Sequence, residues 1–175
     1  MSILAAQGNG GMQAFSGTIS SSKWGNGSFA TTASRSGDVK TVDGTRTYAS
    51  GRTASDSVTI TRNADGSMTR DATVTRANGK IVQRDLTYSA SQGGTRTVSG
   101  TITQGNGTVD QVSGTSTHTQ GDSDIALLLT NPSGLTATHN EMVTTSGNTT
   151  SSTSSGTGFD GKTLSGETTR TRMTG

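Results

Sequence analysis

ITRNADGSMTRDATV, residues 60–74, and VTRANGKIVQRDLTY, residues 74–88, are two copies of one unit that decides the fold. With one gap, both windows begin with hydrophobe-Thr-Arg, carry Asp-Gly or Asn-Gly at the centre, and contain an Arg-Asp pair followed one residue later by Thr. Threonine favours strands, and Asx-Gly pairs tolerate the positive φ that tight hairpin turns demand. The repeat therefore predicts a modular array of β-hairpins.

Asx-Gly pairs recur along the whole chain and predict its hairpin turns. Asn78 and Asn106 are 28 residues apart, twice the 14 residues between Val98-Ser-Gly-Thr and Val112-Ser-Gly-Thr. A step of this length leaves strands of roughly nine to ten residues. The predicted turns are Asn9-Gly10, Asn26-Gly27, Asp43-Gly44, Asp65-Gly66, Asn78-Gly79, Asn106-Gly107 and Asp160-Gly161.

Between the turns, side-chain types alternate with the period of a strand. Val58, Ile60 and Arg62 alternate with threonines, and the even positions from 68 to 76 alternate with Thr and Asp in the same way. One face then mixes hydrophobes with arginine, and the other is a ladder of Thr and Asp. We expect an all-β fold, an antiparallel meander of long strands packed through the arginine-bearing face as a β-sandwich or two-layer sheet, with strand exchange between subunits as one way to complete it.

The composition contains too few hydrophobic residues for a conventional core. Hydrophobic residues make up 26% of the 175 residues, whereas globular domains usually have about 45 to 50%. The formal net charge is only +2 and the filler is mainly threonine, so disorder is not the expected result. There is no cysteine, so neither disulfides nor thiolate metal sites can form. We expect a marginal monomer that is stabilised by assembly with other copies.

Three zones differ in composition. Residues 1–35 are rich in Gly and Ser and form a candidate donor strand, residues 36–120 hold the hairpin repeats, and residues 121–175 form a C-terminal β segment. Within the last zone, residues 125–129 are a dense apolar run that fits a strand buried on both faces, either in the core of this subunit or shared between subunits. Residues 144–158 are of low complexity, and we predict that they form a linker; the alternative is a Ser/Thr ladder within a sheet.

Candidate contacts for assembly follow from these zones. We expect an N-terminal donated strand, aromatic anchors where aromatic residues are scarce, and a buried acceptor or core strand. These residues are Ile3 and Leu4 for the donated strand, Phe15, Trp24 and Phe29 for the anchors, and Ile125, Leu127 and Leu129 for the acceptor.

No pattern in the sequence predicts catalysis or a cofactor. His139 and Glu141 lack the cysteines of a zinc deaminase motif, and no Gly-x-Ser-x-Gly elbow supports a hydrolase. Asp122 and Asp124 could attract calcium, but an ordinary polar turn is the simpler interpretation. Nucleic-acid binding is not expected either, because the arginines form no basic run and the hairpin region holds only Tyr48 and Tyr88 for stacking. We therefore expect no enzyme activity, no cofactor and no metal.

Thr-x-Thr triplets recur along the chain, among them Thr59-Ile-Thr61 and Thr73-Val-Thr75, and each places paired hydroxyls on one face of a strand. Such an array resembles the ice-binding face of Thr-rich antifreeze β-solenoids, although here the spacing is irregular and Asp interrupts the ladder. Ice or glycan binding therefore stays open as an alternative.

The repeat Thr-hydrophobe-Thr-Arg-x-x-Asp/Asn-Gly-x-x-x-x-Arg-Asp, strongest over residues 58–115, resembles Thr/Gly-rich repeat segments of bacterial secreted filament or biofilm-matrix proteins. The resemblance implies a self-assembling structural subunit outside the cell. The N-terminal residues lack the basic region and the long apolar stretch of a secretory signal, so we expect export without a classical signal peptide. Its expected partners are copies of itself and a cell-surface or matrix polysaccharide, with no nucleic acid and no membrane span. The alternatives are an adhesin or glycan-binding module and a virion fibre or coat component.

Overall fold

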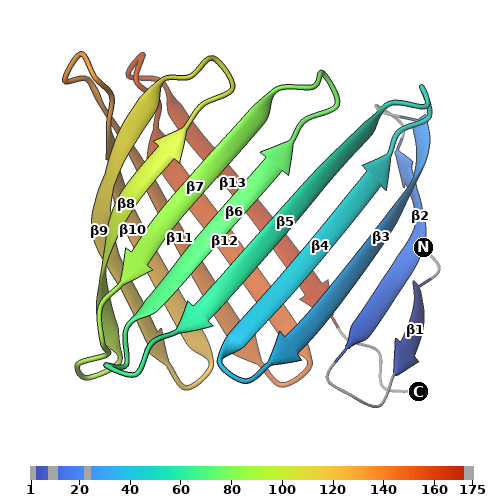
Figure 1. Ribbon diagram of the computed structural model, residues 1–175, viewed down its shortest axis with the longest axis horizontal. Helices are drawn as coiled ribbons and strands as arrows, with labels where there is room; N and C mark the ends of the chain where they lie inside the picture. The colour runs from blue at the N-terminus through green and yellow to red at the C-terminus, as the bar shows by residue number, and fades with distance from the viewer. Residues whose placement is uncertain (1–2, 8–11, 22–24, 172–175) are drawn as a thin grey trace. The chain divides into compact units, whose positions relative to one another are not determined.

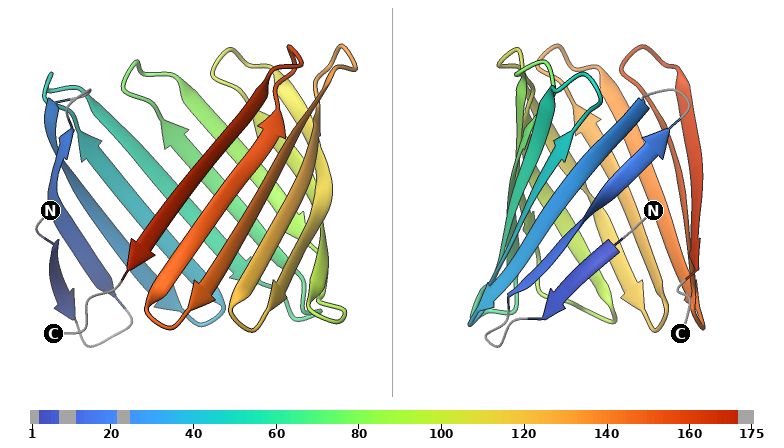
Figure 2. Two further views of the ribbon diagram at one scale, coloured as in Figure 1. Left: turned by 180° about the vertical axis from the view of Figure 1, so that it is seen from behind. Right: turned by 90° about the vertical axis from the view of Figure 1, so that its right-hand side faces the viewer.

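The fold is all-β, as the sequence predicts. A computed structural model describes residues 3–7, 12–21 and 25–171, and in these residues it contains thirteen strands and no helix. Each strand neighbours the next along the chain in the strand order, so the expected antiparallel meander is confirmed (Figures 1 and 2). Packing as two layers stays a prediction. The strands are β1 Ile3–Gln7, β2 Gln13–Ser21, β3 Gly25–Ser36, β4 Val39–Thr47, β5 Thr53–Arg62, β6 Met68–Thr75, β7 Ile81–Tyr88, β8 Thr95–Thr103, β9 Val109–Thr119, β10 Asp122–Thr130, β11 Thr136–Ser146, β12 Thr149–Thr157 and β13 Thr163–Thr171.

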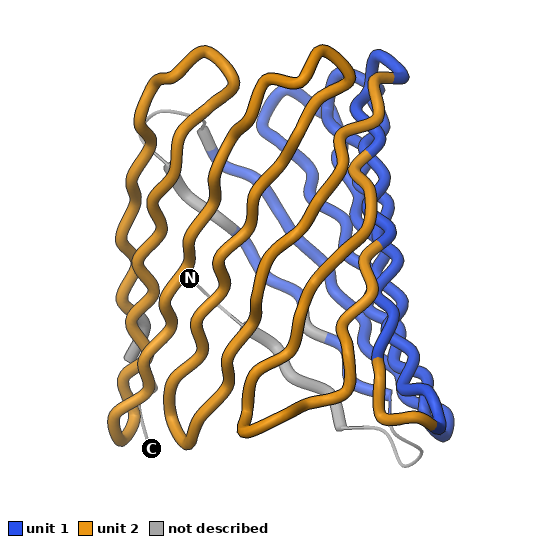
Figure 3. The backbone as a smooth tube through the Cα atoms, turned by 90° about the vertical axis from the view of Figure 1, so that its left-hand side faces the viewer, with its two compact units in different colours: residues 1–64, 68–85, 103–107 blue, residues 65–67, 86–102, 108–175 orange. Residues whose placement is uncertain are grey.

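The chain divides into two compact units, which are coloured separately in Figure 3. Unit 1 comprises residues 1–64, 68–85 and 103–107, and unit 2 comprises residues 65–67, 86–102 and 108–175. The change from one unit to the other falls within β7. The three zones 1–35, 36–120 and 121–175 are defined by composition alone and stay a prediction.

Five loops of identical length join alternate pairs of strands. They span residues 48–52, 76–80, 104–108, 131–135 and 158–162, so their starts are 28, 28, 27 and 27 residues apart. In each loop the fourth residue is glycine, at φ between 75° and 85°, and its N–H donates to the carbonyl of the first residue over 2.8 to 2.9 Å. In four of the five loops the N–H of the first residue also donates to the carbonyl of the fifth, which leaves three residues between this pair. The geometry is a type I turn followed by a left-handed glycine, as is common in three-residue hairpin loops.

Four of the predicted Asx-Gly pairs lie in turns, namely Asp65-Gly66, Asn78-Gly79, Asn106-Gly107 and Asp160-Gly161. Their glycine carries the positive φ and no other residue type among the described residues does, so none of these turns is type I′, which needs two successive positive φ angles. Asn9-Gly10 lies outside the described residues.

Two predicted turns are wrong, because Asn26-Gly27 lies inside β3 and Asp43-Gly44 inside β4. Neither glycine has a positive φ. Each instead allows a close approach: a Cβ on Gly27 would come within 2.6 Å of the Thr47 carbonyl oxygen, and one on Gly44 would come within 2.5 Å of Asp56 Oδ1.

Several turns were missed because their glycine follows a residue other than Asn or Asp. Ser-Gly pairs turn the chain at Gly37, Gly51, Gly134 and Gly147, all at positive φ. Gln-Gly pairs do the same at Gly93 and Gly121. The glycine φ is the physical requirement of such a turn, and the preceding side chain is secondary.

The strand register of unit 1 separates its side chains onto two faces. Val42 lies opposite Val58, which lies opposite Ala72. We call this side the arginine face; it carries the odd residues 29–35 of β3 and the even residues 40–46, 54–62 and 68–74 of β4 to β6. The hydroxyl face is the other side, on which Asp43 lies opposite Ser57, and Ser57 opposite Thr73. The predicted division into arginine and threonine faces is confirmed for β5 and β6.

Few of the described residues are buried in either unit. In unit 1, Ala72 and Val82 are buried. In unit 2, the buried hydrophobic residues are Leu86, Val98, Val112 and Ala137, and the carboxylate of Asp110 is also buried, at 1% exposure. The small number of buried hydrophobic residues agrees with the low hydrophobic content of the sequence.

Two expectations for the C-terminal zone need correction. β10 is an interior strand of unit 2, but only one of its faces is covered, because Leu128 on the other face is 41% exposed. The low-complexity stretch 144–158 is not a linker. It forms the end of β11 and all of β12, since its Ser and Thr residues pair with β11 on one side and β13 on the other. The alternative, a Ser/Thr ladder, is correct.

Candidate assembly edges and binding faces

The two ends of the strand order are edge strands. Among the described residues, β1 pairs only with β2, in unit 1, and β13 pairs only with β12, in unit 2. An edge strand presents unpaired backbone N–H and C=O groups along its free side. These two strands are therefore the places where a strand of another chain could add to either unit.

Strand β13 has few of the features that protect an edge. It is nine residues long and contains neither lysine nor proline, and its two charged residues are Glu167, at its centre, and Arg170, next to its end. The side chains of residues 163–169 are all exposed, and that of Leu164 is 70% exposed. The sequence of β1, ILAAQ, contains no charged residue.

The predicted N-terminal contact residues lie in the first three strands. Ile3 and Leu4 belong to β1, where their backbones pair with Gly17 and Ser16 of β2. Phe15 lies in β2, and Phe29 is half-buried on β3. Trp24 lies outside the described residues. The roles of these residues in assembly stay predictions.

Ile125, Leu127 and Leu129 share one face of β10 and are half-buried there. Their strand is hydrogen-bonded to β9 and β11 along its length, so its backbone is not available to a donated strand. Whether these residues serve the core of the subunit or a contact between subunits stays a prediction.

Hydroxyl groups form short ladders across neighbouring strands. Thr95 Oγ1 lies 3.1 Å from Thr117 Oγ1, and Thr138 Oγ1 lies 3.0 Å from Thr157 Oγ1.

Ser and Thr also line a shallow depression in each unit. The depression of unit 1, about 430 Å³, surrounds Ala30, and that of unit 2, about 270 Å³, surrounds Ala126. Their further lining residues on these faces include Ser16, Thr18, Ser28, Thr45 and Thr47 in unit 1, and Thr115, Thr117, Asp124, Asn140, Met142, Thr153 and Ser155 in unit 2.

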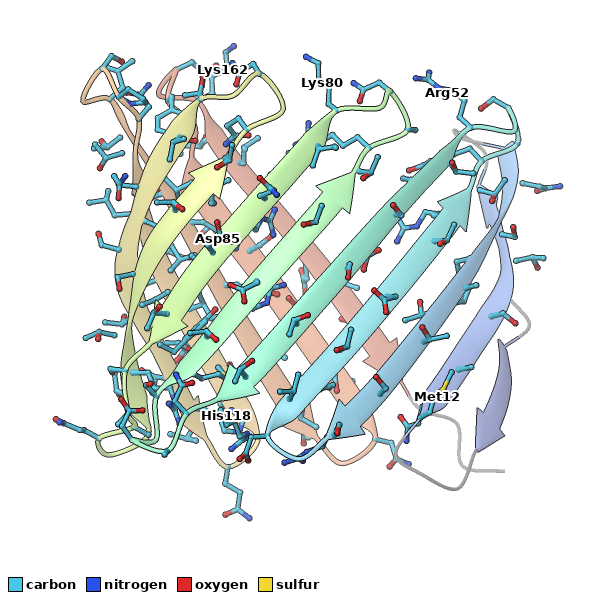
Figure 4. The ribbon with its side chains drawn as sticks, in the orientation of Figure 1. Met12, Arg52, Lys80, Asp85, His118 and Lys162 are labelled. Carbon is cyan, nitrogen blue, oxygen red and sulfur yellow. The ribbon has the colours of Figure 1, made fainter. Side chains whose placement is uncertain are left out.

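Charge is divided between the two faces of unit 1. On β3 to β6, the arginine face carries five basic residues and one carboxylate, Asp56, whereas the hydroxyl face carries Asp43 and Asp71 and no basic residue. The basic residues are Arg35, Lys40, Arg46, Arg62 and Arg70. Arg52 and Lys80 add positive charge at the loops 48–52 and 76–80 (Figure 4), where Arg52 Nε donates to the Ala77 carbonyl over 2.8 Å.

Arg84 on β7 is two residues from the buried Val82 and therefore lies on the same side of the strand. Desolvation by the surrounding protein is the main cause that lowers the pKa of its guanidinium, and the positive charges of Arg70 and Arg76 lower it further. Arg84 nevertheless keeps an exposed surface, so it can meet a ligand from solvent although protein atoms crowd it.

This concentration of charge was missed by the sequence analysis, which found no basic run. The signal was present in the period-two alternation of Arg with Thr, but the strand register is needed to bring residues from separate strands together.

Groups that could support catalysis or bind a metal are dispersed. Among residues 3–7, 12–21 and 25–171, no three His, Cys, Asp or Glu side chains gather as a metal site would require. His139 Nε2 and Glu141 Oε2 are 3.9 Å apart and form an exposed pair. Asp122 and Asp124 lie on β10 instead of in a turn loop.

Among residues 3–7, 12–21 and 25–171, no helix has the length and apolar character needed to cross a membrane.

Comparison of the chain with protein-family models, with curated proteins and with solved structures finds no match.

Proposed function

We propose that this chain is a structural subunit that assembles with other copies of itself, through backbone pairing of edge strands, into a filament or matrix fibre outside the cell. The observation that carries the proposal is β13, a nine-residue edge with neither lysine nor proline, whose side chains are exposed at residues 163–169. Long edges of this kind template the addition of another strand unless charge or proline blocks them.

The charges favour pairing of β13 with β1 over pairing of β13 with itself. A fully overlapped antiparallel pair of two β13 strands would place Glu167 of one copy opposite Glu167 of the other, because residue 167 is the centre of the strand. Like charges directly opposite each other destabilise a strand pair. Strand β1 has no charge to oppose it. Contact between two different edges is heterologous and extends into an open polymer unless the rotation closes.

The test compares two lysine substitutions at paired positions. Ser165→Lys places a charge on the edge strand, and Ser155→Lys places the same charge on β12, directly opposite Ser165 and also exposed. Sedimentation velocity and negative-stain microscopy at micromolar concentration should show polymers for the unchanged chain and for Ser155→Lys, and smaller species for Ser165→Lys. A chain that stays monomeric without any substitution, or equal effects of the two lysines, would refute the proposal.

Removal of the other edge gives an independent test. Deleting residues 2–7 takes away β1, and the longer deletion of residues 2–15 also shortens β2. Both deletions should abolish polymerisation while leaving most of the β-sheet signal in circular dichroism. Filaments that persist after both deletions would exclude β1 as a contact.

A second candidate function, glycan binding by an adhesin-like module, is supported by the hydroxyl-lined depressions around Ala30 and Ala126. Hydroxyl groups can exchange hydrogen bonds with a neutral sugar, and Ala126→Phe would fill the depression of unit 2. Retention of the unchanged chain on a glycan array, lost in Ala126→Phe, would favour this function. Ice binding and a virion fibre or coat role remain alternatives without a specific structural observation.

A further inference from the structure

The strand register of unit 1 places cationic side chains in a row across the sheet. Arg35 of β3 lies directly opposite Lys40 of β4, Lys40 lies opposite Ile60 of β5, and Ile60 lies opposite Arg70 of β6. All four residues lie on the arginine face. Because neighbouring strands are about 4.8 Å apart, the row from Arg35 to Arg70 extends over roughly 14 Å.

The row is electrostatically unbalanced. In the described part of the chain, the ion pairs are His139 with Glu141 and Lys162 with Asp160, so no carboxylate lies within 4.0 Å of the cations in this row. The hydrogen bond from Arg35 Nε to the Gly37 carbonyl, 3.2 Å long, leaves the remaining N–H groups of this guanidinium for other partners. Arg35 and Lys40 face each other as like charges, which destabilises a strand pair. An anionic partner would relieve this repulsion.

Further cations border the row on the same face. Arg62 is two residues beyond Ile60 and is the last residue of β5. Arg46 lies near the end of β4 that is far from Lys40. Both are exposed. The field of Arg70 and Arg76 is strong enough at Arg84 to contribute to its lowered pKa. The positive charge of this face is therefore concentrated, whereas the hydroxyl face of β3 to β6 has carboxylates only.

We propose that the arginine face of unit 1 binds an acidic polysaccharide, with Arg35, Lys40 and Arg70 as the contacts to successive anionic groups. The length of the row requires a ligand with several charges, since one small anion cannot reach from Arg35 to Arg70. Guanidinium groups bind carboxylate and sulfate through paired hydrogen bonds.

A nucleic acid is the less suitable polyanion, because binding of single strands combines basic residues with aromatic side chains on which bases stack. The arginine face of β3 to β6 carries one aromatic residue, Phe29, which lies opposite Arg46 and six residues along β3 from Arg35, and β4 to β6 carry none on this face. The proposal concerns side chains of interior strands and does not depend on pairing at the edges β1 and β13.

The experiment measures binding of a fluorescent polyuronate to the full chain by anisotropy, at low and at physiological salt, below the concentration at which the protein assembles. Neutral dextran and a single-stranded oligonucleotide of equal charge serve as comparison ligands. We expect the polyuronate to bind, binding to weaken with salt, the oligonucleotide to bind at least tenfold more weakly, and dextran not to bind.

Two double variants assign the site. Lys40→Gln with Arg70→Gln removes two charges from the row and should weaken polyuronate binding about tenfold or more. Lys80→Gln with Lys162→Gln removes two charges from the loops and should change it less than twofold. Lys40→Arg with Arg70→Lys keeps the charges and should retain most of the affinity. Circular dichroism and thermal unfolding confirm that each variant is folded.

No binding of polyuronate by the unchanged chain would overturn the proposal. So would equal losses in the row variant and the loop variant, because the effect would then follow net charge alone. An oligonucleotide that binds as tightly as the polyuronate would overturn the choice of an acidic polysaccharide.

Discussion

Replacement of a loop glycine isolates the energetic cost of one backbone conformation. Gly79 is the fourth residue of the loop 76–80, at φ 79°, and no heavy atom lies within 4 Å of the position that a Cβ would occupy there. Gly79→Ala should therefore meet no steric obstacle. Its entire cost comes from holding an L-residue in the left-handed region, which is about 1 to 2 kcal/mol.

For a chain of this length, each 1 kcal/mol lowers the unfolding midpoint by roughly 2 to 4 °C. We therefore expect Gly79→Ala to lower the midpoint by about 2 to 8 °C in thermal unfolding followed by far-ultraviolet circular dichroism. Gly79→Asn should cost less than Gly79→Ala, because asparagine visits the left-handed region more readily. The equivalent glycines Gly51, Gly107, Gly134 and Gly161 have φ between 75° and 85° and equally open surroundings, so their Ala variants should behave alike.

Gly156 provides the contrasting case. It lies inside β12 without a positive φ, and a Cβ there would overlap the backbone carbonyl of Thr138 on β11. Gly156→Ala should therefore be destabilising for a steric reason, and Gly156→Asn should be worse than Gly156→Ala because asparagine is larger. If Gly79→Ala is neutral, or if asparagine is no better than alanine at Gly79, the attribution of the cost to backbone φ is refuted.

Three further predictions concern charge and packing. Lys40→Gln removes one of two directly opposed cations and should raise the free energy of unfolding by about 0.2 to 1 kcal/mol at low salt; thermal melts at high salt should show a smaller gain. The hydrogen bond from the Lys162 side chain, and then that from the Lys162 backbone N–H, lowers the pKa of Asp160 below its ordinary value of 3.8. The contribution of this carboxylate to stability is thus present above about pH 4 and is lost as the pH falls through the lowered pKa. An NMR titration should give a midpoint below 3.8 that rises towards 3.8 in Lys162→Ala. Val98 is 2% exposed, and Val98→Ala should cost about 2 kcal/mol in chemical denaturation, whereas Val109→Ala, at a position 40% exposed, should cost less than about 0.5 kcal/mol.

The fold class could be predicted because its signal is local. Threonine alternating with hydrophobes specifies a strand and its two faces, and glycine between such runs specifies a turn. The individual turns were less predictable, since the identity of a dipeptide does not reveal its role. Asp43-Gly44 looks like Asp65-Gly66, yet Gly44 makes room for Asp56, which lies directly opposite it on β5. This partner is twelve residues further along the sequence, so the dipeptide alone does not reveal it.

The sites were harder to predict because they depend on pairing between strands. Residues 125–129 look fully enclosed in sequence, but the alternation of a strand exposes Leu128 on the outer face. Arg35, Lys40 and Arg70 are dispersed in sequence and become neighbours only through the register of β3 to β6. The edges β1 and β13 also follow from the strand order, which composition does not contain.

Assembly at the edges and polysaccharide binding on the arginine face would use different atoms. Edge pairing requires the unpaired backbone groups of β1 and β13, whereas binding requires side chains on β3 to β6, whose backbones are already paired on both sides. A copy added at an edge therefore leaves the cationic row of each subunit in place, and a polymer presents that row once per subunit. Repetition raises the avidity for a long polyanion without any new contact. If both proposals hold, Ser165→Lys should leave the affinity of one subunit for a short polyuronate unchanged, while weakening retention on a long one as the polymer dissociates.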